Sequence, residues 1–413
     1  IFLPKPSGIL RPLSLLSVED QIVYQALANI VAERLVRSVG TRYNKQVFAH
    51  QYAGVESPWF YRKWSDGYRA FNKAAEKAYR DGFEWTASFD LTAFYDSIDH
   101  KVLRHFVEIL GCEPELSNQL TEFLSAWTAT KTRIYHNHGI PQGPLSSGLI
   151  AETVLAYFDL KHPRDGGVRY FRYVDDIRLF ARDSQQLRGM LVALDLLSKD
   201  IGLFPQSGKI DIHYITDIDR ELKSVSTPAE AVLLAPELDQ KALVKRLVAL
   251  TPNFKVENQT RFKYLLGRAV PAARLTERLW RIYEKQPHLY DAIARYLSRY
   301  TVMPDKVAFR LIREIDKQRL YPAVRAAFVQ ASIARLSPRA TKAATRTLKP
   351  LWTPRVSQPD LSDALAAFLH AEHKFTDRQS EYSIVSTKPA WLRARVQYAV
   401  DWPSVSERYR RQW

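Results

Sequence analysis

Two neighbouring aspartates are the first residues of this sequence whose types and spacing could do chemistry. Asp175 and Asp176 lie between two segments rich in aromatic and β-branched residues, in the run Phe171-Arg-Tyr-Val-Asp-Asp-Ile-Arg-Leu-Phe180. A tight hairpin there would hold both carboxylates at its tip, where adjacent anions repel each other unless a cation lies between them. The pair therefore indicates a divalent-metal site, although an Asp-Asp pair by itself is more often a solvated turn.

A third carboxylate favours the metal site. Asp90 ends a run of strand character and precedes a helix start, so its side chain can point from a strand end toward the hairpin. Two divalent cations about 3.5–4 Å apart need bridging carboxylates from separate elements. Asp90 and Asp175 would bridge both ions, and Asp176 would be a supporting ligand. We interpret Asp96 and Asp99 as helix-start charges that suit the positive end of a helix dipole.

A loop rich in Gly and Pro lies between these carboxylates in the sequence. It reads Gly139-Ile-Pro-Gln142-Gly143-Pro-Leu-Ser-Ser-Gly148 and precedes a segment with apolar residues at helical spacing. Such a loop has a fixed backbone, which lets a nucleotide or a base approach the main chain closely. A purely structural loop is the alternative when this segment is taken alone.

The elements that must position these residues are mixed. Strand character at 84–90 and 168–173 alternates with helical spacing at 146–160, without a repeating βαβ period. Strands and helices interleaved in this way predict an α+β fold.

The chain beyond Lys241 has helical periodicity and almost no strand signal. The segments 290–297, 321–328 and 361–368 look like one degenerate helix that recurs, which predicts stacked helix pairs of the α-solenoid kind. Ordinary core helices in an irregular bundle are the alternative.

Charge is distributed unevenly along the chain. Residues 241–413 hold 33 Lys and Arg against 14 Asp and Glu, whereas the first 240 residues hold 27 against 30. This asymmetry suggests a body that keeps its own carboxylates, joined to a half that attracts a phosphate backbone. Basic helices that are simply solvated are the alternative.

The single cysteine, Cys112, excludes an internal disulfide and a multi-cysteine zinc site, which points to a reducing compartment. We find no signal peptide and no apolar run of the ~18 residues that a membrane span needs. We therefore expect a cytoplasmic protein that binds no membrane. Because the sequence begins at Ile1 without a Met, we also expect that N-terminal residues are missing.

These segments together resemble the palm of reverse transcriptases, in the family's order. Asp90, the Pro-Gln-Gly loop and Tyr173-Val-Asp-Asp correspond to motifs A, B and C, and Gly202-Leu-Phe-Pro-Gln-Ser-Gly-Lys209 resembles motif D. The segment 3–13 resembles the fingers motif, a basic hairpin over the incoming triphosphate. The sequence departs from the usual pattern at Gln206, where Asn is common, and at Gln21, where Arg is common.

The resemblance implies a role for each matching residue. Two Mg²⁺ ions, with Mn²⁺ as a substitute, would be held by the set Asp90, Leu91, Asp175 and Asp176. Lys209 would protonate the departing pyrophosphate. The nucleotide would be bound by the set Lys5, Arg11, Tyr95, Gln142 and Gly143, where Lys5 and Arg11 neutralise the triphosphate. Tyr95 stands where these enzymes carry a ring that blocks a 2′-hydroxyl, which implies a preference for deoxynucleotides.

The expected order of domains indicates which kind of reverse transcriptase the chain resembles. We expect fingers at 1–84, a palm at 85–235 and a basic α-helical, HEAT-like domain at 236–413 in place of a thumb. This right-hand palm and fingers followed by an all-α helical-repeat domain is similar to abortive-infection and other defence-associated bacterial reverse transcriptases. A mobile-element enzyme of the group II intron or retron type, copying its own RNA, is the alternative. The non-enzymatic alternative is a degenerate palm that is kept as an RNA-binding scaffold. Three closely packed anions argue against it, because an inactive site has no need for them.

The partners that the resemblance implies are deoxynucleotides, an RNA template or non-coding RNA, and nascent single-stranded DNA. Basic and aromatic residues interleave at 261–264, 278–283 and 408–413, as suits stacking on single strands. Arginines that snorkel over buried rings would give the same pattern. The sequence leaves open a homo-oligomer, synthesis without a template, and a primer of RNA, DNA or protein tyrosine.

Overall fold

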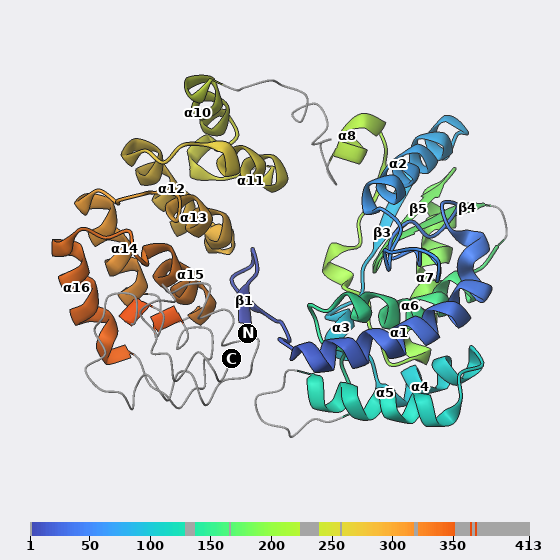
Figure 1. The fold of residues 1–413 in the computed structure, drawn as a ribbon. Coiled ribbons are helices and arrows are strands. Elements are labelled where there is room, and N and C mark those ends of the chain that lie inside the picture. The colour runs from blue at the N-terminus through green and yellow to red at the C-terminus, as the bar shows by residue number, and fades with distance from the viewer. Residues whose placement is uncertain are drawn as a thin grey trace. The chain divides into compact units, whose positions relative to one another are not determined.

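The computed structural model describes residues 2–128, 137–164, 167–223, 239–256, 258–317, 321–351, 364–365 and 368–369. By compactness the chain divides into two units, one of residues 14–225 and the other of residues 1–13 with 226–413 (Figure 1). Each unit has its own hydrophobic core. Among the described helices, none combines the length and the apolar character that crossing a bilayer requires.

The unit of residues 14–225 is built on a four-stranded antiparallel sheet with the strand order β4-β5-β3-β6. Its strands are β3 (Trp85–Phe89), β4 (Val168–Tyr173), β5 (Asp176–Ala181) and β6 (Ile212–Tyr214). The strand β3 therefore lies in the middle of the sheet, directly beside β5. Together with the helices around it, this sheet confirms the mixed strand and helix character predicted from the sequence.

Helices surround the sheet of this unit. They are α1 (Val18–Val39), α2 (Trp64–Arg80), α3 (Phe94–Ser97), α4 (His100–Ile109), α5 (Pro114–Trp127), α6 (Leu145–Lys161), α7 (Ser184–Asp200) and α8 (Ile218–Lys223), with short 3₁₀ turns at Gly40–Arg42 and Ser207–Lys209. Almost every residue of α6 is buried, and this helix packs against α1, α4 and α7. A helix that is buried on most of its sides is a core helix, so α6 is a rigid support for the loop that precedes it.

The two faces of the sheet belong to different cores. Ile177 and Leu179 of β5 face the main core, to which α6 and α7 contribute, while Phe180 joins a smaller core with Phe71 of α2. Because side chains alternate along a strand, Asp176 lies on the same side as Phe180, away from the main core. The carboxylates of the sheet therefore lie on the face opposite α6 and α7.

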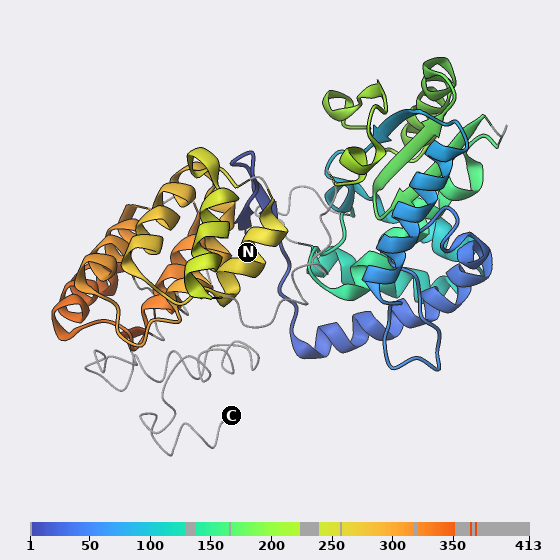
Figure 2. The same ribbon diagram turned by 90° about the horizontal axis from the view of Figure 1, so that it is seen from above.

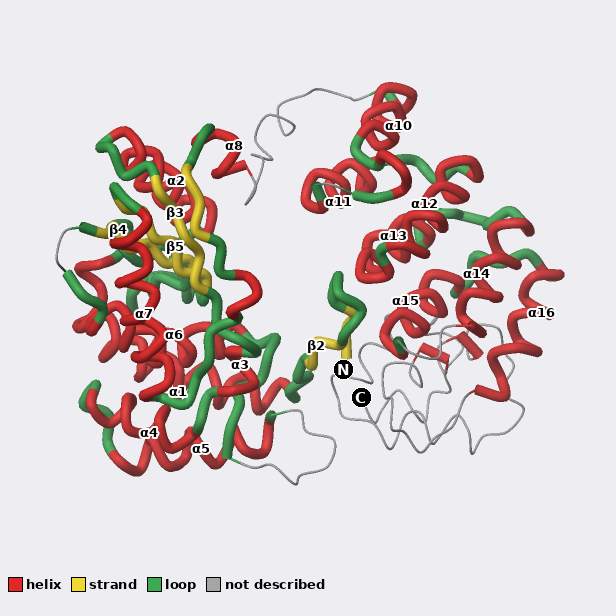
Figure 3. Tube along the Cα trace, turned by 180° about the vertical axis from the view of Figure 1, so that it is seen from behind, coloured by secondary structure: helices red, strands yellow, loops and turns green. Residues whose placement is uncertain are grey.

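The other unit is helical apart from one short hairpin, as the red and yellow tubes of Figure 3 show for its described part. Its helices are α10 (Gln240–Ala249), α11 (Gln259–Arg268), α12 (Ala273–Lys285), α13 (Tyr290–Leu297), α14 (Asp305–Lys317), α15 (Pro322–Ser332) and α16 (Pro338–Leu348). Alternate helices pack together, so that α11, α13 and α15 form one row and α12, α14 and α16 form a second (Figure 2). The predicted helices at 290–297 and 321–328 correspond to α13 and α15, whereas the segment 361–368 lies largely outside the described residues.

The hairpin of this unit consists of β1 (Phe2–Pro4) and β2 (Leu10–Pro12), and β1 packs against α15. Gly8 closes the hairpin with a φ of 85°, which favours glycine. The Tyr321 hydroxyl donates a hydrogen bond of 2.9 Å to the Gly8 carbonyl. The hairpin predicted from the sequence is therefore present, and it forms one compact unit with residues from the far end of the chain.

Candidate active site

A tight turn joins β4 to β5. Tyr173 and Asp176 are paired residues of the two strands, so only Val174 and Asp175 form the turn. Val174 has a φ of 59°, a conformation that is costly for a β-branched residue. The hairpin predicted around the two aspartates is confirmed, and its tip presents both of them.

The register of the sheet brings the third carboxylate to this tip. Phe89 of β3 pairs with Ile177 of β5, which places Asp90, one residue further on, beside Asp176. Burial raises the pKa of Asp175 and Asp176, and the Asp90 carboxylate raises both further. The structure therefore brings together the three carboxylates that the sequence singled out, close enough to repel one another.

Two cationic side chains lie against these carboxylates. The ammonium group of Lys209 is 2.9 Å from Asp90 Oδ2, and Arg178 Nε is 3.5 Å from Asp176 Oδ1. The segment around Lys209 is tied to the end of β3 because the Gln206 amide donates a 2.8 Å hydrogen bond to the Asp90 carbonyl. Lys209, which the sequence predicted as a proton donor, therefore contacts the carboxylate cluster.

The donor set suits a divalent cation, although its side chains are not arranged as a ready metal site. Within the part of the chain that the structure describes, no three His, Cys, Asp or Glu side chains are grouped closely enough to hold an ion. Oxygen donors are the ligands that Mg²⁺ and Mn²⁺ prefer, and a divalent cation would relieve the repulsion that raises the two pKa values. Leu91, also predicted as a ligand, has a buried side chain and a backbone that pairs with Pro205.

The Pro-Gln-Gly loop is fixed by hydrogen bonds and by backbone shape. Gln142 Nε2 donates a 2.9 Å hydrogen bond to Asp96 Oδ1, and the Ser14 amide donates one of 2.9 Å to the Gln142 carbonyl. Gly143 has a φ of 129°, and a Cβ there would lie 3.2 Å from the Ser14 carbonyl oxygen. Asp99 caps α4 as predicted, whereas Asp96, besides lying in the first turn of α3, anchors the loop, which the sequence did not indicate.

Tyr95 lies between the loop and the carboxylates. The Ile140 amide donates a 2.8 Å hydrogen bond to the Tyr95 carbonyl, which ties α3 to the loop. Burial raises the pKa of the Tyr95 hydroxyl, and the charges of Glu152 and Asp175 raise it further. The ring is therefore close to the hairpin tip, where the sequence placed a group that contacts the nucleotide.

An arginine under the hairpin tip was missed at the level of sequence. Arg172 is fully buried and forms ion pairs of 2.7 Å with Glu152 and 2.6 Å with Asp159, both on α6. Burial alone would lower the pKa of Arg172, but the two carboxylates hold it well above its ordinary value. The Arg172 guanidinium also donates a 2.9 Å hydrogen bond to the Val174 carbonyl. The strained turn is thereby attached to the core helix α6.

A pocket of about 690 Å³ adjoins the same turn and includes Val174 in its lining. Trp59 and Trp64 line it and are 75% and 73% exposed, and Arg62 and Lys63 lie between them in the sequence. Exposed rings beside cations are the surface on which bases of single strands stack. These four residues were missed at the level of sequence.

Comparison with known families identifies the class to which this site belongs. Residues 3–265 match the model of the family described as reverse transcriptase (RNA-dependent DNA polymerase). The chain therefore belongs to the reverse transcriptase family, whose enzymes are nucleotidyltransferases that generally use divalent metal ions. This confirms the family and the enzyme class predicted from the sequence.

Comparison with curated proteins gives no match. Among solved structures, the chain is similar to telomerase from Candida albicans in complex with a TWJ fragment of telomeric RNA (TM-score 0.35, 13% identity, 84% of this chain and 57% of that one). It is also similar to telomerase from Candida tropicalis in complex with such a fragment (0.38, 12%, 88% and 63%) and without it (0.34, 12%, 83% and 61%). The chain thus spans about three fifths of the telomerase chains that it matches.

Proposed function

We propose that this protein is a DNA polymerase that joins deoxynucleotides by two-metal phosphoryl transfer, on an RNA template or without one. The observation that carries the proposal is the register of β3 with β5, which sets Asp90 beside Asp176 at the hairpin tip, where Asp175 forms the turn. These three carboxylates, with Leu91, would hold two Mg²⁺ ions, for which Mn²⁺ can substitute. When bound, the ions activate the attacking 3′ oxygen and neutralise the leaving pyrophosphate.

Residues around the carboxylates act on the incoming nucleotide and on the leaving pyrophosphate. Lys209, which contacts Asp90, donates a proton to the departing pyrophosphate. Tyr95 blocks a 2′-hydroxyl with its ring. Gln142 and Gly143, held by Asp96 and the Ser14 backbone, shape the pocket around the incoming sugar and base.

In the N-terminal hairpin, Lys5 and Arg11 neutralise the triphosphate of the incoming nucleotide. Lys5 directly follows the first strand of the hairpin, and Arg11 lies in the second, where Leu3 is its partner residue. Both are cations, and the forked donors of Arg11 suit bidentate contact with phosphate oxygens. In this assignment the fingers comprise residues 1–84 and the palm residues 85–235.

Primer extension tests the polymerase proposal. The full chain is incubated with a primed RNA template, deoxynucleotides and Mg²⁺, beside the variants Asp90→Asn and Asp175→Asn. Both variants should lose synthesis by roughly a hundredfold or more, the scale of losing one preorganised charge at an active site. Glu115→Gln, an exposed carboxylate on α5, is the control and should keep it. Synthesis that survives Asp175→Asn would refute the assigned site.

We propose a role in bacterial antiphage defence, because the domain order resembles that of defence-associated reverse transcriptases. Alternate helices of the helical unit pack in two rows, as the helix pairs of a HEAT-like repeat do, and we propose that residues 236–413 replace a thumb in this way. We further propose that this domain binds an RNA template or non-coding RNA and the nascent DNA strand, and that the protein acts in the cytoplasm. The molar mass of the protein in solution tests whether it forms a homo-oligomer.

Sequencing separates the defence role from the alternative. The nucleic acid that copurifies with the protein is sequenced together with the DNA that the protein makes. A homopolymer or a short repeat agrees with a defence enzyme. A faithful copy of one structured RNA would instead indicate a mobile-element enzyme of the group II intron or retron type.

A further inference from the structure

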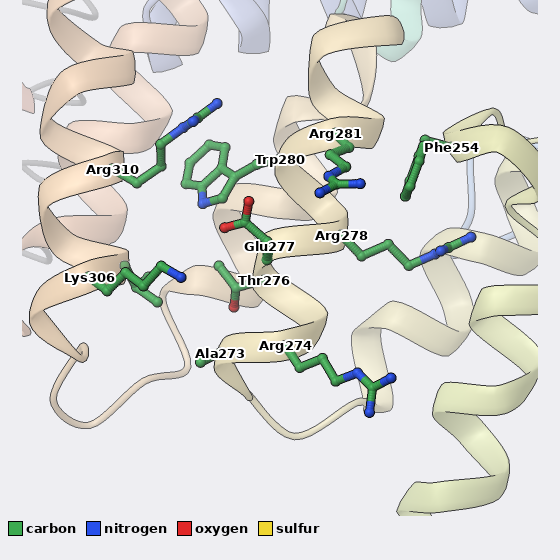
Figure 4. Close-up of a pocket in the computed structure, with 11 residues that line it drawn as sticks. Phe254, Ala273, Arg274, Thr276, Glu277, Arg278, Trp280, Arg281, Lys306 and Arg310 are labelled. Carbon is green, nitrogen blue, oxygen red and sulfur yellow. The ribbon is translucent and has the colours of Figure 1, made fainter.

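A strongly basic pocket of about 430 Å³ lies in the helical unit, between α12 and α14 (Figure 4). Five cationic side chains line it against one acidic side chain, Glu277. The cations are Arg274, Arg278, Arg281, Lys306 and Arg310. Such an excess of positive charge in a concave surface attracts anions.

Among the described residues, most of this positive charge has no counterion. Arg310 pairs with Glu284 at 2.5 Å and with Glu314 at 3.0 Å, whereas the described acceptors of Arg278 are neutral oxygens of Thr251 and Val248. For the exposed side chains of Arg274, Arg281 and Lys306, the described residues provide no ion pair.

The cations of the pocket also act on one another. Burial lowers the pKa of Arg278, and the charge of Arg281 lowers it further. The neighbouring guanidinium groups of Arg278 and Arg281 therefore repel each other, and a bound anion would relieve that repulsion.

A buried donor points to the same kind of ligand. Trp280 is only 2% exposed, and its Nε1 has no hydrogen-bond partner in the part of the chain that the structure describes. Figure 4 shows this nitrogen turned into the space bordered by Glu277 and Lys306. Because an indole N–H can only donate and a buried unpaired donor is costly, the missing partner is an acceptor such as a phosphate oxygen.

Backbone groups add to the attraction for an anion. Ala273 and Arg274, which begin α12, line the pocket, and so does Lys306 near the start of α14. No side chain caps the start of α12, so its first amides are free to donate. The first turn of α12 thus faces the pocket with its positive end.

We infer that this pocket binds a phosphate group of a single-stranded nucleic acid. Trp280 Nε1 and the uncapped amides of α12 donate to the phosphate oxygens, and Arg274, Arg281 and Lys306 neutralise them. The three cations are exposed, so a continuous strand can enter from solvent. The ring of Phe254, half-buried beside Arg278 and Arg281, offers a surface for the adjoining base.

The inference deepens the proposed function and rests on it only for the source of the strand. A free nucleotide carries the same phosphate chemistry, so the experiment must separate the two sources.

Binding of a labelled oligodeoxythymidine to the full chain, measured by fluorescence anisotropy without Mg²⁺, tests the pocket. The pocket variant is Arg274→Glu with Lys306→Glu. The matched control is Lys342→Glu with Arg346→Glu on the exposed side of α16, which makes the same change of net charge. The pocket variant should bind roughly tenfold more weakly, and its dependence on salt should fall by about one counterion. Equal losses in both variants would overturn the inference.

A variant that should bind the strand more tightly provides a second test. Glu277→Gln removes the one carboxylate that competes with the phosphate for the donors, and should tighten binding severalfold. Trp280→Phe removes the Nε1 donor and should weaken binding while its thermal unfolding midpoint stays close to that of the wild type. If neither variant changes the affinity, the pocket is not the phosphate site.

Competition identifies the source of the phosphate. Inorganic phosphate and a deoxynucleoside triphosphate should displace the strand only at far higher concentration. A triphosphate that binds as tightly as the strand and loses affinity in the pocket variant would assign the site to free nucleotides instead. Asp175→Asn should bind the strand like the wild type, so a failed polymerase assay and a failed pocket are distinguishable.

Discussion

At the scale of single residues, the carboxylates at the hairpin tip oppose the stability of the fold. Because burial and the neighbouring charges raise the pKa of Asp175 and Asp176, their ionised forms destabilise the folded chain. Below the ordinary carboxyl pKa of about 3.9 both groups are neutral whether the chain is folded or unfolded, and this penalty vanishes. The penalty develops as the pH rises from the ordinary carboxyl pKa to the raised pKa values of the two aspartates, and it is complete above them.

Asp175→Asn should therefore unfold at a higher temperature than the wild type at neutral pH. The gain should shrink as the pH falls and disappear below the ordinary carboxyl pKa, because an amide cannot ionise. Thermal unfolding midpoints across a pH series check this, with Glu115→Gln as the exposed control. A gain that is the same at every pH would show that removing a buried, ionised carboxylate is not its cause.

Tyr95 carries the second prediction at this scale. Tyr95→Ala should relax the preference for deoxynucleotides over ribonucleotides, because the ring near Asp175 would no longer occupy the space of a 2′-hydroxyl. Tyr95→Phe keeps the ring and should keep the preference. The ratio of kcat/KM for the two nucleotides measures the effect, and equal use of both by the unchanged protein would contradict the assignment.

At the scale of elements, the β4–β5 hairpin depends on its attachment to α6. Arg172→Met would leave the buried carboxylates of Glu152 and Asp159 without their arginine counterion, which costs about 3–5 kcal/mol of unfolding free energy. It would also remove the donor to the Val174 carbonyl, so the strained turn that carries Asp175 should shift. Denaturant unfolding and primer extension should both show a loss.

A compensated variant separates positioning from stability. Adding Glu152→Gln and Asp159→Asn to Arg172→Met removes the unpaired charges and should recover most of the lost unfolding free energy. Synthesis should stay low, because the Val174 carbonyl still lacks its donor. If synthesis returned together with stability, Arg172 would be a structural residue only.

The elements that local patterns encode could be predicted from the sequence. Alternating apolar residues and a short turn indicated the hairpin at Asp175 and Asp176, and a strand end indicated Asp90. The Arg172 pairs could not be predicted, because their partners lie 13 and 20 residues away along the chain and meet Arg172 only when α6 packs on the sheet. A lone arginine in a strand pattern carries no sign of such burial.

Long-range pairing also explains what else was missed. Asp96 looks like a helix-start charge, and Gln142, which donates a hydrogen bond to its side chain, is 46 residues away. The packing of the N-terminal hairpin with residues beyond 225 into one compact unit is a further case. The contact between Gly8 and Tyr321 spans 313 residues, and no local pattern specifies it.

At the scale of the whole molecule, charge and chemistry lie in different parts of the sequence. The first 240 residues contain the three clustered carboxylates and have a slight excess of acidic residues, while the remainder has 33 basic residues against 14 acidic ones. Attraction for nucleic acid should therefore come mainly from the basic part, through release of counterions from the phosphate backbone.

Salt should accordingly change template binding and leave the chemical step almost unaffected. Between 50 and 200 mM salt, the KM for a primed RNA template should rise by roughly tenfold or more, because exposed charge pairs are screened and counterion release becomes less favourable. The kcat should stay within about twofold, since the partly buried carboxylates are screened much less. Extension rates at saturating template check this. A kcat that fell with salt while KM stayed constant would show that the basic half takes part in the chemical step rather than in holding the nucleic acid.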